Sequence, residues 1–144
     1  IDDSPEATLA LRFAARRAAR TGGGVMVLGI VPPQDFVAFG GVQATIEAEA
    51  REHAEELVAA AADAIAQEAN VTPQIMVKSG KPAEIVRDVI GANDEIAALV
   101  LATAASGAPG PLVAHFTGHD AGTLPCPVML VPGAIDLARL DALS

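Results

Sequence analysis

The chain has 144 residues and a formal net charge of −9, and 51% of its residues are hydrophobic although only four are aromatic. This length fits one domain, and the composition suits a core packed from small aliphatic side chains. The acidic balance disfavours nucleic acids and anionic membrane surfaces as partners, and no apolar run approaches the ~20 residues of a bilayer span. With a single cysteine, Cys126, an internal disulfide is impossible, so we expect a cytoplasmic protein.

The first residues, 1–5, predict the end of a strand that runs into a helix. No strand body precedes them, so we expect the N-terminal strand to be largely absent from the chain. Ser4 is expected as the helix N-cap and Pro5 as the first helical residue. The glycines at 22–24 should end the helix, and its last turns carry an arginine cluster that is expected to be solvated: Arg16, Arg17 and Arg20.

Apolar runs and helical periodicities predict the later elements in chain order. Strands are expected at 25–31, 74–77, 96–102 and 128–131, and helices at about 44–69, from 82 through 90, at 111–117 and in the tail after 132. The segment 34–41, with Phe36 and Phe39, is expected to form a loop over the carboxyl edge of the sheet. This alternation predicts a doubly wound parallel sheet, whose ligands bind beyond the carboxyl ends of the strands.

The chain has three histidines that could take part in chemistry. His53 falls on or beside the apolar stripe of the long helix, which favours a partly buried packing histidine over a functional one. His115 and His119 are four residues apart with Asp120 adjacent, so on a helix they could share one metal. A catalytic zinc normally takes three protein ligands, and two solvated loop histidines are the plainer interpretation. We therefore expect no metal site.

Four segments resemble the universal stress protein family. They are Ile1–Glu6 (I-D-D-S-P-E), Leu28–Pro33 (L-G-I-V-P-P), Val77–Glu84 (V-K-S-G-K-P-A-E) and Cys126–Pro132 (C-P-V-M-L-V-P). The resemblance implies a Rossmann-like, mostly parallel five-stranded sheet of order 3-2-1-4-5. It covers a domain at 1–132, which leaves a tail at 133–144 as a possible short helix. It also implies a homodimer through the closing strand: Val128, Met129, Leu130 and Val131.

In nucleotide-binding members of the family, the fourth strand runs into G-x-x-G, with G-S or G-T nine residues later. Here 102–105 reads A-T-A-A, and the later pair falls near His115. A true G-x-x-G at 107–110 is followed by Gly122-Thr123, too close to the last strand for a helix to follow. Asp2 matches the carboxylate that approaches adenosine, or is ordinary charge at a helix N-terminus. The candidate vestigial cleft comprises Asp2, Asp3, Val31, Leu101, Ala102, Thr103, Ala105 and His115.

The sequence lacks the common catalytic constellations. There is no G-x-S-x-G elbow, and Ser79-Gly80-Lys81-Pro82 lacks the remaining residues of a Walker loop. We therefore expect a non-enzymatic stress-response or regulatory homodimer with weak or no ATP binding and no cofactor. The alternative is an adenine-nucleotide sensor that binds ATP or AMP in the same cleft.

Overall fold

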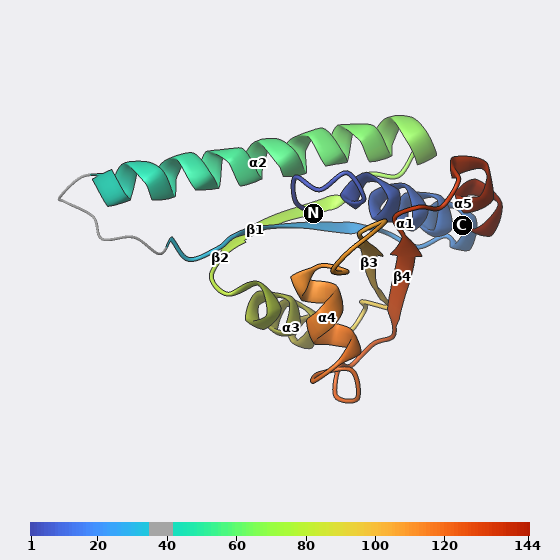
Figure 1. Ribbon diagram of the computed structural model, residues 1–144. Helices are drawn as coiled ribbons and strands as arrows, with labels where there is room; N and C mark the ends of the chain where they lie inside the picture. Colours follow the sequence, from blue (N-terminus) through green and yellow to red (C-terminus); the bar gives the residue numbers. More distant parts are fainter. Residues whose placement is uncertain (35–41) are drawn as a thin grey trace.

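The computed structural model describes residues 1–34 and 42–144 (Figure 1). The loop expected at 34–41 therefore lies, apart from Gln34, outside the described residues. The elements follow in chain order: α1 (Ala7–Thr21), β1 (Met26–Val31), α2 (Val42–Ala69), β2 (Gln74–Ser79), α3 (Pro82–Ala92), β3 (Leu99–Thr103), α4 (Pro111–Thr117), β4 (Val128–Pro132) and α5 (Leu137–Leu143).

The strands are parallel, but in the described residues they form two separate pairs. β1 pairs with β2, and β3 pairs with β4. The expected single five-stranded sheet of order 3-2-1-4-5 is not confirmed, because no ladder joins β1 to β3 in the described chain. At that edge of β1, the Leu28 carbonyl instead accepts a hydrogen bond of 2.7 Å from the Ile1 nitrogen.

Helices cover both faces of the strands, so the domain has three layers. In Figure 1, α1 and α2 lie on one side of β1 and β2, and α3 and α4 lie on the other. Alternate residues of β1 point to opposite faces of the sheet. Val27 packs against α1 and α2, whereas Leu28 and Ile30 pack against α3 and α4. Strands covered on both faces have no polar face, which explains the continuous apolar run of β1.

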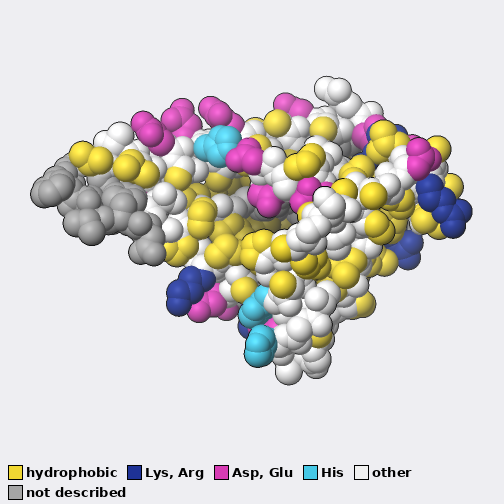
Figure 2. Space-filling model, viewed as in Figure 1, with side chains coloured by type: hydrophobic (Ala, Val, Ile, Leu, Met, Phe, Trp, Pro, Cys, Tyr) yellow, Lys and Arg dark blue, Asp and Glu magenta, His cyan; other side chains and the backbone are white. Residues whose placement is uncertain are grey.

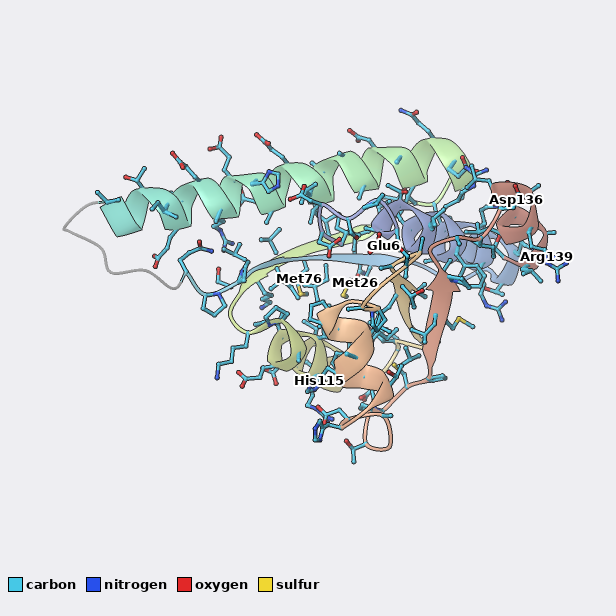
Figure 3. All side chains as sticks on the ribbon, in the orientation of Figure 1. Glu6, Met26, Met76, His115, Asp136 and Arg139 are labelled. Atoms are coloured by element: carbon cyan, nitrogen blue, oxygen red, sulfur yellow. The ribbon has the colours of Figure 1, made fainter. Side chains whose placement is uncertain are left out.

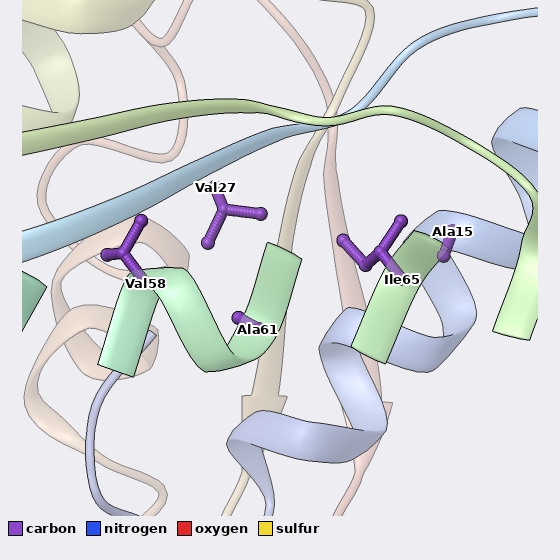
Figure 4. Close-up of a cluster of buried hydrophobic side chains, with 5 residues drawn as sticks. All are labelled: Ala15, Val27, Val58, Ala61 and Ile65. Carbon is purple, nitrogen blue, oxygen red and sulfur yellow. The ribbon is translucent and has the colours of Figure 1, made fainter. Parts of the chain in front are cut away.

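The two cores consist of small aliphatic side chains and one phenylalanine. Figure 4 shows the first, which joins α1, β1 and α2: Ala15, Val27, Val58, Ala61 and Ile65. The second lies between α3 and α4 and contains Val86, Ile90 and Phe116. The predicted apolar stripe of the long helix supplies Ala61 and Ile65 to the first core. Close packing of this kind compensates for the low aromatic content.

The start of α1 differs from the prediction. The helix begins at Ala7 after Glu6, which makes no side-chain capping bond. Ser4 is not the N-cap, because its amide and its hydroxyl both donate to the Asp2 carboxylate in a tight local turn. The predicted end is confirmed: Gly22 has a φ of 74°, a left-handed conformation that glycine adopts without strain.

The tail after Pro132 forms the helix α5, which packs on α1. Asp136 caps it by accepting a hydrogen bond of 3.2 Å from the Arg139 amide, and Leu140 is fully buried. Figure 3 shows both labelled residues at the end of the molecule where α5 lies. Within the described chain, no helix has the length and hydropathy needed to span a bilayer.

Candidate functional site

The carboxyl ends of β1 and β2 border an open cleft. The Gly80 amide donates to the Val31 carbonyl at 3.0 Å, which holds the two strand ends together. A cleft of about 540 Å³ lies between these ends and the first half of α2. Its lining is Val31, Pro32, Pro33, Gln34, Ala44, Glu47, Ala48, Arg51, Ser79 and Gly80. Of the predicted site residues, only Val31 lines this cleft.

Arg51 is the cationic side chain of the cleft, and sequence reasoning missed it. Its guanidinium donates to the Ser79 hydroxyl at 3.3 Å and lies 3.2 Å from the Glu55 carboxylate. Figure 2 shows acidic side chains along α2, and Glu47 of this helix also lines the cleft. The sequence offered one indication of a polar site here, since Ser79 lies at the end of a strand. Its partner lies 28 residues earlier in the chain.

Asp2 takes part in the turn that precedes α1. Its Oδ1 atom accepts from the Ser4 amide at 2.9 Å and from the Ser4 hydroxyl. Asp2 is exposed, and its position beside β1 follows from the bond between Ile1 and Leu28. The carboxylate therefore has a structural role in this turn.

Asp3 forms an ion pair with His53 of α2. The His53 Nε2 atom lies 2.8 Å from the Asp3 Oδ2 atom, and both side chains are more than half exposed. The hydrogen bond to Asp3 and the attraction of its charge raise the pKa of His53 above its ordinary value. The interpretation of His53 as a partly buried packing histidine is wrong, because its ring is exposed and bonds to Asp3. Sequence periodicity could not show this, since Asp3 is 50 residues away in the chain.

Leu101, Ala102 and Thr103 form the end of β3, each half-buried and paired with β4. The chain then turns in a loop that the Ala104 amide closes by donating to the Pro109 carbonyl at 3.3 Å. Gly133 presses against this loop: a Cβ atom there would lie 2.2 Å from the Thr103 carbonyl oxygen. The loop is thus packed against Gly133, which directly follows β4.

Three positions in and directly after the loop that follows β3 offer no free backbone donor. Pro109 and Pro111 lack an N–H group, and the Ala104 amide is already bonded. Gly107 and Gly110 have φ values of 76° and 111°, so the G-x-x-G at 107–110 shapes the turn into α4. The pair Gly122-Thr123 follows α4 and starts no helix, as expected from its closeness to the last strand.

His115 lies in the last turn of α4, not in a loop. Its Nε2 atom is 2.6 Å from Asp120 Oδ2, and its ring meets Phe116 edge-on at 4.9 Å. Arg87 of α3 also binds Asp120, at 3.0 Å, and these bonds lower the pKa of Asp120, with that from His115 the largest cause. Figure 3 shows His115 on α4 below the strands.

The structure brings together only parts of the predicted cleft. Asp3 contacts α2, Val31 lines the cleft at β1 and β2, and Ala105 lies in the loop after β3. Among the described residues, no hydrogen bond or ion pair joins Asp2 or Asp3 with the loop after β3, and His115 is directed to Asp120. The same part of the chain holds no group of three histidine, cysteine or acidic residues suited to a metal ion.

Parallel strands with helices on both faces define an α/β domain, and an open cleft lies at the carboxyl ends of two of its strands. The chain belongs to the universal stress protein family, whose family model matches residues 1–132. No curated protein matches it. It is similar in fold to universal stress protein UspA from Lactobacillus plantarum, with a TM-score of 0.74 and 20% identity over 91% of this chain and 92% of that one.

Proposed function

We propose that this universal stress protein acts as a non-enzymatic stress-response or regulatory homodimer that binds ATP weakly or not at all. The loop after β3 carries this proposal. Phosphate binding by a turn of this type relies on bare glycine backbone and free amides at a helix start. Here Ala102 and Ala105 stand at the glycine positions, and the helix starts with Pro111, which has no amide hydrogen.

The test is a thermal shift titration with ATP and Mg²⁺. A ligand at one hundred times its Kd raises the stability of the folded state by ~2.7 kcal/mol, a readily measured change. We expect no shift at 1 mM ATP. A saturable shift that disappears on Asp2→Ala would overturn the proposal, since Asp2 is the family-matched carboxylate.

The homodimer is proposed through the closing strand β4. In the described chain β4 pairs only with β3, so its other edge is open to a second copy. Leu130 at its centre is 42% exposed. We expect Leu130→Glu to convert the dimer into a monomer in light scattering after gel filtration. Ile75→Glu is the matched control, because Ile75 is an exposed hydrophobic residue on β2.

A second candidate function is an adenine-nucleotide sensor that uses the cleft at Val31. The cleft volume of about 540 Å³ favours it, because ligand sites commonly span ~300–1,000 Å³. In this case AMP would bind about as well as ATP, since the phosphate loop contributes little. A titration that compares AMP with ATP, followed by Arg51→Gln, distinguishes this function from the first. The cytoplasm stays the proposed location of either function.

A further inference from the structure

Of the three arginines expected in a solvated cluster, Arg17 and Arg20 are exposed, whereas Arg16 is half-buried. Arg12, Arg16 and Arg20 recur every four residues, so they form one stripe along the helix. Arg17, which is exposed, lies off this stripe. In a chain with a net charge of −9, three aligned guanidinium groups are a concentrated positive surface.

The tail helix α5 and the end of α2 cover this stripe. Arg12 binds both oxygens of the Asp141 carboxylate at 2.7 Å, and it lies 2.9 Å from Glu68 of α2. Arg16 lies 3.2 Å from Glu68 and 3.3 Å from Asp141. The fork geometry of arginine suits such two-point pairing with a carboxylate.

Two further contacts hold the end of α5. Arg20 donates to the backbone carbonyl oxygen of Ser144. Leu140 is the only fully buried apolar side chain of α5, and Leu137 and Leu143 beside it are 52% and 49% exposed. The helix has seven residues, so its own backbone bonds cannot hold it in place. Its attachment therefore depends on one leucine, on the bond from Arg20 to the buried Ser144, and on charge pairs that remain about one third exposed.

We propose that α5 is a displaceable cover of the arginine stripe on α1, and that the uncovered stripe binds a partner helix that presents a leucine followed by an aspartate. The proposal goes beyond the assigned family, whose model ends at residue 132, before α5 begins. The contacts that Leu140 and Asp141 make on α1 define the chemistry of that partner. An acidic amphipathic helix can supply both groups, one in place of Leu140 and one to Arg12.

The partner helix must compete with α5 for the arginine stripe, and the short connection from β4 to α5 favours α5. Four residues, 133–136, separate the two elements, and a short tether of this kind gives an effective concentration in the millimolar range. A partner segment therefore binds the wild-type chain weakly, because only the uncovered fraction accepts it. Loosening α5 should increase the apparent affinity without altering the stripe.

The test uses a fluorescent peptide with the sequence of residues 133–144 and measures its binding to full-length protein by fluorescence anisotropy. Leu140→Ala and, separately, the milder Asp141→Asn loosen the chain's own α5. We expect the peptide to bind each variant at least tenfold more tightly than wild type. Adding Arg12→Gln and Arg16→Gln should abolish this gain, whereas adding Arg17→Gln should preserve it.

Two results would overturn the proposal. One is equal peptide binding by wild-type and loosened chains that remain folded by circular dichroism. The other is hydrogen exchange of α5 amides as slow as that of β1 in the wild-type protein, because a displaceable cover must open more often than the core. A peptide with scrambled sequence and the same charge should bind poorly, and equal binding by it would also contradict the leucine and aspartate requirement.

Discussion

The Nε2 atom of His53 lies 2.8 Å from the Oδ2 atom of Asp3, which ties the middle of α2 to the segment before α1. This bond spans 50 residues and joins two exposed side chains. It gives His53 a charged partner at the carboxyl edge of the domain, near the turn of Asp2. The pKa of His53 therefore depends on whether Asp3 keeps this position.

Replacing Asp3 should lower the pKa of His53. The hydrogen bond to Asp3 is the largest cause of the raised pKa, so Asp3→Asn should return the His53 pKa toward its ordinary value in an NMR titration. A raised folded pKa means that the pair stabilises the fold below the unfolded pKa and loses this effect as pH rises through the folded pKa. Asp2→Asn is the control and should leave the pKa of His53 almost unchanged. An unchanged His53 titration in Asp3→Asn would show that the pair does not form in solution.

The close contact between β1 and α2 predicts the effect of a single methyl group. A Cβ atom at Gly29 would lie 2.5 Å from Cγ2 of the buried Val58, so Gly29→Ala should destabilise the protein by ~1–3 kcal/mol in urea unfolding. Gly24→Ala, with open space around the new Cβ atom, should cost far less. In a Val58→Ala background the cost of Gly29→Ala should fall. An equal cost in both backgrounds would contradict the packing shown here.

The Cys126 thiol should react slowly in the folded protein. Burial raises its pKa above the ordinary value, although a backbone hydrogen bond with Leu99 acts in the opposite direction. Because the thiolate is the reactive form, alkylation by iodoacetamide at pH 8 should be slower than for a free thiol. Unfolding in urea should restore the ordinary rate. Native and unfolded rates that agree would show that the thiol is freely accessible.

The attachment of α5 should weaken in acid. The hydrogen bond from Arg12 lowers the pKa of Asp141, so its stabilising effect is present above the unfolded carboxyl pKa, about 3.9, and is lost as pH falls through the lower folded pKa. Amides of α5 should then lose hydrogen-exchange protection before those of β1. In Asp141→Asn the early loss should already be present at neutral pH. Simultaneous loss in α5 and β1 would contradict local detachment.

The elements of the fold were largely predictable because their causes are local. The continuous apolar run of β1 follows from burial on both faces, and Gly22 ends α1 by its positive φ. Similarly, Pro111 and Pro132 mark the start of α4 and the end of β4. The single five-stranded sheet was not confirmed, because pairing between strands depends on contacts that no local pattern specifies.

The site was less predictable because its contacts are long-range. The apolar periodicity of α2 placed His53 near the packed stripe, but the charge of Asp3 holds it at the surface. Arg16 was expected in a solvated cluster, but it is half-buried and pairs with Asp141 of the tail, far away in the sequence. Composition can indicate that such charges are present, but only the folded chain pairs them.

Native mass spectrometry of freshly purified protein tests the central claim, an assembled dimer without bound nucleotide, most directly. The account predicts a species of twice the 14.5 kDa chain mass that gains no further mass when ATP is added at micromolar concentration. A species that carries one adenine nucleotide per chain after purification would contradict it.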